Sequence, residues 1–265
     1  MPRLIFVLLD GLRLDVATSV MGFMDAQAEA LSRPPIAVRS ELPSLSRPLY
    51  ETLMTGVPPI RSGITGNQVV RRSRHDSVFD RCRLAGKVTA AAAYHWFSEL
   101  YNEAPFEPRH RLTDAPNAAI QHGLFYWSET YPDDHLFADA EALRRQHEPD
   151  FLLIHAMGID DAGHRHGESS PAYATAARRA DALLALHLPA WLEAGYAVIV
   201  TSDHGMGDDG MHGGPDPDET SVPFWLFGAG QQTEHVHLRQ TEIAGTVCAL
   251  LGVSSEGMDV NEALL

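Results

Sequence analysis

Acidic and imidazole side chains recur in this sequence just after short apolar runs. Asp10, Asp160 and the pair Asp203 and His204 each come at or shortly after the end of such a run. Aspartate oxygen and histidine nitrogen are ligands that zinc accepts. If the apolar runs are strands of one open sheet, their carboxyl ends bring these side chains to one edge, where α/β proteins place their sites. The sequence therefore predicts a metal site built from distant segments.

Two motifs add further candidate ligands. Asp160 and His164 are four residues apart, so a helical turn or a tight loop lets them share one cation. His212 follows Asp203 and His204 after a glycine-rich stretch, whose glycines allow the backbone to turn back toward the strand end. Each motif alone also fits a solvated polar loop, so the prediction depends on their combination.

Ser46 is the candidate nucleophile. It stands two residues before Pro48, at the start of a helical pattern that ends at Gly56. Ser46 as the cap and Pro48 in the first turn is a common helix start. A helix N-terminus also favours an attacking alkoxide and phosphoryl oxygens. A serine that only caps a helix gives the same pattern.

Strand-length apolar runs alternate with helical patterns along the chain. Several runs are apolar almost throughout, which is typical of strands buried on both faces of a sheet. The alternation predicts an α/β fold, a three-layer α/β/α sandwich with a mainly parallel central sheet. The predicted strands are Leu4–Leu9, Val88–Tyr94, Phe151–Ala156, Ala197–Thr201 and Val222–Phe227, and the predicted helices are Val16–Leu31, Pro48–Met54, Leu136–Gln146, Tyr173–Glu193 and Thr241–Leu251.

We expect residues 1–265 to form a single domain. Residues 67–148 are less regular and rich in aromatic side chains, and we expect a small cap insertion within this range. The apolar run at the N-terminus is too short to span a bilayer and has no cleavage site, so we expect a cytoplasmic protein without a membrane segment.

Composition excludes some classes of function. The formal net charge of −15 repels nucleic-acid backbones, so nucleic-acid binding is not expected. Cys82 and Cys248 are the two cysteines, which does not suggest a disulfide framework. The sequence does not determine the oligomeric state.

Taken together, the segments resemble the alkaline phosphatase superfamily, in particular its type I phosphodiesterase/nucleotide pyrophosphatase family. The ordered motifs are an Asp-Gly after the first strand, a hydroxyl residue before a proline, an Asp-x-x-Gly-His, and an Asp-His-Gly-Met with a later histidine. The segment Ser62–Asn67 also looks like the one that follows the nucleophile helix there. The loop from Asp203 to Gly214 looks like that of the ethanolamine-phosphate transferases of the same superfamily.

This resemblance implies a two-metal hydrolase of phosphodiester or pyrophosphate bonds that works through a phospho-Ser46 intermediate. The cations it implies are Zn²⁺, with Mn²⁺ as the alternative, and the substrate is a small phosphorylated molecule. The matching ligands are Asp10, Ser46, Asp203 and His204 for one cation, and Asp160, His164 and His212 for the other.

Two positions depart from the pattern of the nucleotide pyrophosphatases. Arg47 replaces an aromatic residue that stacks on the base, and Leu49 replaces an asparagine that binds a phosphoryl oxygen. Arg47 could hold a second anionic group of the substrate, because guanidinium pairs bidentately with phosphate or carboxylate. An exposed surface arginine is the alternative. Sulfatases need an arginine where this chain has Tyr50, which disfavours sulfate ester hydrolysis.

Two other functions are compatible with the same residues. One is a phosphomonoester or phosphonate hydrolase on the same metal centre, since the fold and the ligands are shared. The other is a metal-binding protein without catalytic activity. The presence of a hydroxyl nucleophile together with every implied ligand favours the enzyme.

Overall fold

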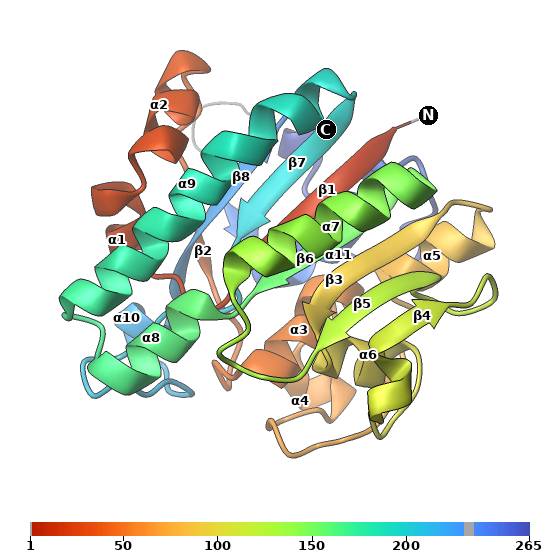
Figure 1. Cartoon of the computed structure of the whole chain (residues 1–265), viewed down its shortest axis with the longest axis horizontal. Helices are drawn as coiled ribbons and strands as arrows, with labels where there is room; N and C mark the ends of the chain where they lie inside the picture. Colours follow the sequence, from red (N-terminus) through yellow and green to blue (C-terminus); the bar gives the residue numbers. More distant parts are fainter. Residues whose placement is uncertain (1, 231–235) are drawn as a thin grey trace.

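The computed structural model describes residues 2–230 and 236–265, and in this part of the chain nine strands form one sheet (Figure 1). The strands lie in the order β4-β5-β3-β6-β1-β7-β8-β2-β9. Their bounds are β1 Arg3–Leu9, β2 Ile36–Arg39, β3 Thr89–Tyr94, β4 Leu112–Asp114, β5 His122–Tyr126, β6 Phe151–Ala156, β7 Tyr196–Thr201, β8 Ser221–Phe227 and β9 Leu238–Arg239.

The centre of the sheet is parallel, as the sequence predicts. β1 pairs in parallel with β6 and β7, and β3 pairs in parallel with β5 and β6. Antiparallel pairs join β4 to β5, β7 to β8 and β8 to β2 toward the sides of the sheet. The strands β6, β1 and β7 are therefore adjacent, and their carboxyl ends meet at one edge.

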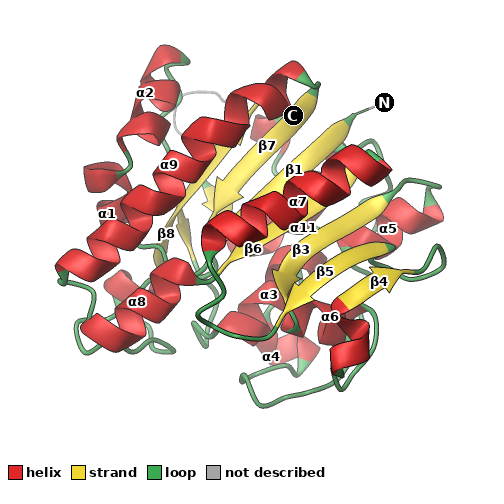
Figure 2. Cartoon of the chain, in the orientation of Figure 1, coloured by secondary structure: helices red, strands yellow, loops and turns green. Residues whose placement is uncertain are grey.

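Helices cover both faces of the sheet, which gives the predicted three layers (Figure 2). One face carries α1 Leu14–Val20, α2 Gly22–Ala30, α7 Asp133–His147 and α9 Pro171–Glu193. The other face carries α3 Ser46–Thr55, α5 Val78–Leu84, α6 Trp96–Tyr101 and α11 Ile243–Leu250. The remaining helices are α4 Pro59–Ser62, α8 Gly158–His166, α10 Pro217–Thr220, and the 3-10 helices η1 Pro108–Arg111, η2 Gln240–Glu242 and η3 Glu262–Leu264.

The alternating direction of the side chains along β1 explains why its sequence is apolar after Arg3. Successive side chains of a strand point to opposite faces. Phe6 and Leu8 join the core against α3, α5 and α11, whereas Ile5 and Val7 join the core against α7 and α9. All four side chains are fully buried. Because each face of this strand is covered by helices, neither set of positions can be polar.

The structure corrects one expectation about the elements and limits where a cap could lie. The helix predicted over Val16–Leu31 is two helices, α1 and α2, which meet at Met21. Within residues 67–148, β3, β4 and β5 belong to the central sheet and α7 to a helical layer. The cap insertion stays a prediction, which only the connections between these elements could form.

The end of α3 provides a test of this packing. Gly56 has a φ of 72°, and a Cβ built on it lies 2.8 Å from the carbonyl oxygen of Thr241. Gly86 has a similar φ of +73°, but a Cβ there meets nothing within 4 Å. We expect Gly86→Ala to lower the free energy of unfolding by about 1–2 kcal/mol, the cost of a left-handed backbone. Gly56→Ala should cost more, because the clash adds to it.

Urea unfolding of the two variants beside the wild type measures this difference. Equal losses of unfolding free energy in the two variants would contradict the prediction. They would mean that the backbone at Thr241 can move away from an added Cβ at position 56.

Candidate metal centre

Three adjacent strands deliver the aspartates to one edge of the sheet. Asp10 directly follows β1, Asp203 follows β7, and Asp160 lies in the first turn of α8, just after β6. Asp10 and Asp203 are fully buried, and Asp160 is 6% exposed. The convergence that the sequence predicts is therefore present in the structure.

The histidines complete the cluster. His164 lies one helical turn after Asp160, and its Nε2 is 3.4 Å from Asp160 Oδ1. His212 returns from the loop after β7, with its Nε2 3.2 Å from His164 Nε2 and 3.7 Å from Asp160 Oδ1. His204 Nε2 lies 3.3 Å from both Asp10 Oδ1 and Asp203 Oδ2.

The possible ligand atoms form two overlapping groups. Asp10, Asp203 and His204 make one group, and Asp160, His204 and His212 make the other, with all ligand atoms of a group within 4.8 Å of one another. His204 belongs to both groups, so they are neighbours. This arrangement suits two cations side by side.

Each of the three histidines presents the same ring nitrogen to the cluster. In each, Nδ1 contacts a backbone carbonyl, which can only accept, so Nδ1 carries the hydrogen and Nε2 keeps its lone pair. The carbonyl partners are Gly210 for His164 at 2.7 Å, Gly205 for His204 at 2.8 Å and Ser44 for His212 at 2.7 Å. Burial lowers the pKa of His204, and burial followed by the proximity of His204 lowers the pKa of His212 to about 3. Neutral rings are the form that binds metal.

One oxygen of each aspartate has no hydrogen-bond partner in the described part of the chain. These buried atoms are Asp10 Oδ1, Asp160 Oδ1 and Asp203 Oδ2. Burial, and then the nearby Asp10, raise the pKa of both Asp160 and Asp203 well above the usual range. Buried carboxylates are costly unless they are paired or coordinate metal. The orphaned oxygens and the lone pairs of the three Nε2 atoms therefore fit divalent cations of the zinc or manganese type.

Asp203 is held in place by its other polar atoms. The Gly11 N–H donates to Asp203 Oδ1 at 3.3 Å, while Ser40 Oγ and Gln240 Nε2 donate to its backbone carbonyl at 2.5 Å and 2.8 Å. The oxygen that faces His204 is the one left unpartnered. The backbone around the strand ends thus fixes which oxygen is available.

Asp10 stays ionised in this setting. Burial opposes its ionisation, yet the hydrogen bond from His155 and the nearby His204 lower the pKa of Asp10 to about 2. The Tyr50 hydroxyl also donates to this carboxylate. The sequence analysis assigned neither His155 nor Tyr50 a role at the site.

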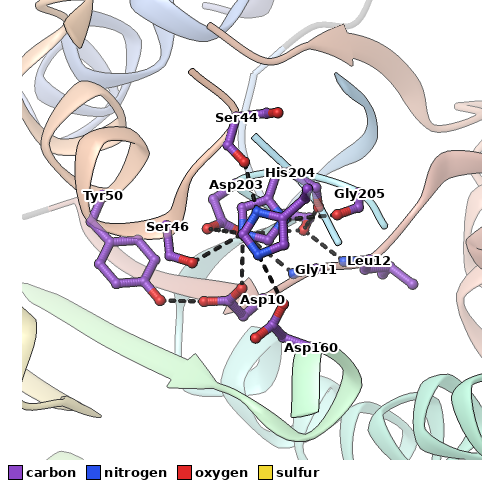
Figure 3. A network of polar contacts seen from close by, with 12 residues as sticks. Asp10, Gly11, Leu12, Ser44, Ser46, Tyr50, Asp160, Asp203, His204 and Gly205 are labelled. Atoms are coloured by element: carbon purple, nitrogen blue, oxygen red, sulfur yellow. Dashed lines mark hydrogen bonds and ion pairs between the residues drawn. The ribbon is translucent and has the colours of Figure 1, made fainter. Parts of the chain in front are cut away.

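Ser46 faces the cluster (Figure 3). Its Oγ lies 3.0 Å from His204 Nε2, and the residue is 4% exposed. The expectation that Ser46 caps α3 is wrong: Leu45 occupies the cap position, Ser46 is the first helical residue, and no side-chain cap bond forms. The hydroxyl is therefore free for chemistry at the cluster.

Asn67 lies beside the nucleophile. The backbone N–H of Arg47 donates to Asn67 Oδ1 at 3.0 Å, and Asn67 Nδ2 has no partner among the residues that the structure describes. This amide is a candidate donor that the sequence analysis missed. Asn67 is 20 residues from Arg47 in the sequence, so no local sequence pattern indicates that the two residues are in contact.

Arg47 is buried, which excludes the surface alternative. Its Nη2 lies 2.6 Å from Glu99 Oε2, its Nε donates to the Asn67 carbonyl at 2.8 Å, and its guanidinium lies 4.5 Å from the centre of the Trp96 ring. The Nη1 nitrogen has no hydrogen-bond partner in the described structure. The contact of Arg47 with a substrate anion stays a prediction, and Nη1 is the guanidinium nitrogen that could make it.

A family model adds the decisive observation. The model of the type I phosphodiesterase/nucleotide pyrophosphatase family matches residues 4–212, a range that holds every candidate ligand and ends on His212. The chain belongs to this family. It is thus an enzyme of the alkaline phosphatase superfamily. The members to which it is similar are phosphoric ester hydrolases and transferases.

Several curated relatives are transferases. The chain is 22% identical over 268 residues to the catalytic subunit of human GPI ethanolamine phosphate transferase 2, covering 95% of this chain and 26% of the relative. It is 39% identical over 84 residues to mouse GPI ethanolamine phosphate transferase 1, covering 30% of this chain and 9% of the relative. The chain thus spans about a quarter or less of the length of these relatives.

Solved structures share the fold. Murine ectonucleotide pyrophosphatase/phosphodiesterase 5 superposes with a TM-score of 0.76 at 13% identity, with both chains fully covered. The phosphonate monoester hydrolase of Silicibacter pomeroyi has a TM-score of 0.68 at 14% identity, covering 100% of this chain and 76% of its own. Within residues 2–230 and 236–265, no helix has the length and apolar character needed to cross a bilayer.

The first prediction for the site concerns His212. We expect His212→Ala to keep the fold but to weaken the binding of one of two cations. The loss should exceed the roughly 10–100-fold that removal of an outer partner of a ligand costs. Competition with a chromophoric zinc chelator measures the affinity. His166→Ala is the matched control, since His166 is exposed and lies only two residues after His164. Two tightly bound cations in His212→Ala would remove this histidine from the ligand set.

The second prediction concerns Arg47. We expect Arg47→Met to lower the free energy of unfolding by about 3–5 kcal/mol, because it leaves a buried carboxylate without its counter-charge. Adding Glu99→Gln should recover most of this loss, since the glutamine can still accept from the Phe106 N–H as Glu99 Oε1 does. Urea unfolding of the single and double variants measures both effects. A single variant as stable as the wild type would contradict the prediction.

The stable double variant then tests the substrate contact. Loss of the guanidinium should lower kcat/KM for substrates with a second anionic group, by a factor that corresponds to about 1–3 kcal/mol. Aryl diesters with uncharged tails should be affected much less. Equal losses for both kinds of substrate would mean that Arg47 serves the reacting phosphoryl group or the structure instead.

Proposed function

We propose that this protein cleaves phosphodiester or pyrophosphate bonds with two divalent cations and Ser46 as nucleophile. The observation that carries the proposal is the position of Ser46 Oγ, 3.0 Å from His204 Nε2. It faces a cluster in which three carboxylate oxygens have no hydrogen-bond partner among the described residues. A hydroxyl at the start of a buried helix has little reason to face such a cluster unless it takes part in its chemistry.

The residues divide into two ligand sets. Asp10, Ser46, Asp203 and His204 would hold one cation, and Asp160, His164 and His212 the other. Such cations supply Lewis-acid charge that stabilises the serine alkoxide and the leaving oxygen. Three aspartates against two divalent cations leave a net positive charge, which suits a phosphate although the whole chain carries −15.

In the proposed reaction, Ser46 Oγ forms a bond to phosphorus while the bond from phosphorus to the leaving oxygen breaks. In the net reaction, the proton lost by Ser46 ends on the leaving group, which departs as an alcohol or a phosphate. The phosphorylated serine is then attacked by an acceptor hydroxyl, and Ser46 recovers a proton as its bond to phosphorus breaks. The N-terminal end of α3 and the free Asn67 amide would donate to the phosphoryl oxygens.

Transfer to an alcohol is the second candidate for the last step. The curated relatives are named as ethanolamine phosphate transferases, and their similarity extends over most of this chain in the human case. Water and an alcohol differ only in which hydroxyl attacks the phosphorylated serine. The geometry of Ser46 and the ligands serves both outcomes.

The covalent route predicts a phosphorylated Ser46. Acid quenching of a reaction with bis-p-nitrophenyl phosphate should trap a p-nitrophenyl phosphoryl group on the peptide that contains Ser46, because one p-nitrophenolate leaves and the other stays on phosphorus. Addition of a simple alcohol should divert part of the product to a new phosphodiester. Ser46→Ala should abolish turnover and leave most of the cation binding. Ser44→Ala is the matched control, because Ser44 Oγ instead donates to the Gly214 carbonyl at 2.7 Å.

Two outcomes would contradict the covalent route. One is a p-nitrophenyl phosphoryl group trapped on Ser44 instead of Ser46. The other is a Ser46→Ala enzyme with near-normal kcat, which would require direct attack by water.

A substrate panel separates the remaining alternatives. We expect faster cleavage of the diester bis-p-nitrophenyl phosphate than of p-nitrophenyl phosphate or phosphonoacetate. A monoester or phosphonate cleaved far faster would favour the phosphomonoester or phosphonate hydrolase. A chain that binds zinc or manganese but cleaves none of these would favour the inactive metal-binding protein.

A further inference from the structure

The two oxygens of Asp10 have different surroundings (Figure 3). Asp10 Oδ2 lies 3.0 Å from His155 Nε2 and accepts a hydrogen bond from the Tyr50 hydroxyl. Asp10 Oδ1 has no hydrogen-bond partner in the described structure and lies 3.3 Å from His204 Nε2. One oxygen is thus held by protein donors, and the other faces the cluster.

The surroundings of His155 determine which of its nitrogens donates. The backbone N–H of Tyr94 donates to His155 Nδ1 at 3.3 Å, so Nδ1 is an acceptor. In a neutral ring the hydrogen then resides on Nε2, which donates to Asp10 Oδ2. This tautomer is the reverse of that in the three histidines of the cluster, where Nδ1 carries the hydrogen. His155 is therefore built as a donor to Asp10, not as a ligand.

Both donors are fixed by packing. His155 and Tyr50 are fully buried. The Tyr50 ring stacks on the Phe97 ring with centroids 4.6 Å apart. The His155 ring packs edge-on against the Tyr50 ring, with centroids 4.8 Å apart. The Tyr101 hydroxyl donates to the Tyr50 carbonyl at 3.0 Å. Neither side chain can turn away from Asp10 without disturbing the core.

Tyr50 also lies one helical turn after Ser46 on α3. The hydrogen bond to Asp10 therefore ties the helix that carries the nucleophile to the end of β1. A change in the position of α3 would move Ser46 and the donor to Asp10 together.

We propose that Tyr50 and His155 are positioning residues of the metal centre, which hold Asp10 Oδ2 so that Asp10 binds a cation through Oδ1 alone. The inference rests on the two-cation centre of the proposed function. Partners behind a ligating carboxylate orient it, and their loss typically costs about 10–100-fold in metal affinity. Without its two donors, Asp10 could rotate or offer both oxygens.

The test measures cation binding in the absence of substrate. Zinc is titrated into the metal-free protein against a chromophoric chelator, and cobalt is used for the visible spectrum of the bound ion. We expect Tyr50→Phe and His155→Leu each to weaken one of the two cations about 10–100-fold and to change the cobalt spectrum. Tyr196→Phe is the matched control, because it removes the hydroxyl of a buried tyrosine at the start of β7, whereas the cluster lies beyond the other end of this strand.

Two further variants distinguish positioning from a general loss of stability. His155→Gln should restore much of the affinity, since the glutamine amide can donate to Asp10 Oδ2 as His155 Nε2 does. In an Asp10→Asn background, Tyr50→Phe should weaken cation binding little further, because the hydroxyl acts through the Asp10 carboxylate. Thermal unfolding of the metal-free variants records any loss of stability separately.

The outcomes separate the two proposals. If the wild type binds two cations and the Tyr50 and His155 variants bind them equally well, the positioning roles are wrong and the proposed function stands. Weakening by the same factor in the Asp10→Asn background would also overturn the positioning roles. A wild type that binds no divalent cation and cleaves no phosphodiester overturns the proposed function and this inference with it.

Discussion

Buried negative charge at the carboxyl ends of three adjacent strands is the constraint on which the rest of the structure depends. Asp10, Asp160 and Asp203 are packed so closely that the ionisation of one opposes that of the others. The protein supplies hydrogen bonds to one oxygen of Asp10 and one of Asp203 and leaves the other without a partner. The two divalent cations of the proposed function would satisfy the remaining oxygens together.

The sequence predicts the central part of the fold, and it points to the candidate ligands, because both depend on local signals. The predicted strands over residues 4–9, 88–94, 151–156, 197–201 and 222–227 each match an observed strand to within one residue at either end. Strands buried on both faces must be apolar throughout, which makes them easy to recognise. β2 was missed because only one of its faces is buried over four residues, and β4 is exposed and three residues long.

The supporting residues of the site were not predictable in the same way. His155 and Tyr50 lie within apolar segments, where a polar side chain gives no indication of its partner. Asn67 comes to Arg47, the residue after the nucleophile, through a turn of the chain that no periodicity encodes. Arg47 was recognised as unusual, yet its pairing with Glu99 depends on how α3 and α6 pack. Ligand types can be read from a sequence, whereas the atoms behind the ligands require the tertiary structure.

The place of β1 in the sheet has a consequence for synthesis of the chain. β1 is made long before the strands with which it pairs in the described structure, β6 and β7, which begin at Phe151 and Tyr196. Contacts between such distant segments form slowly, because a long loop must close first. Until then the nascent chain exposes the uninterrupted apolar segment Leu4–Leu9. Folding of this chain from the ribosome should therefore depend on protection of β1 until β7 has emerged.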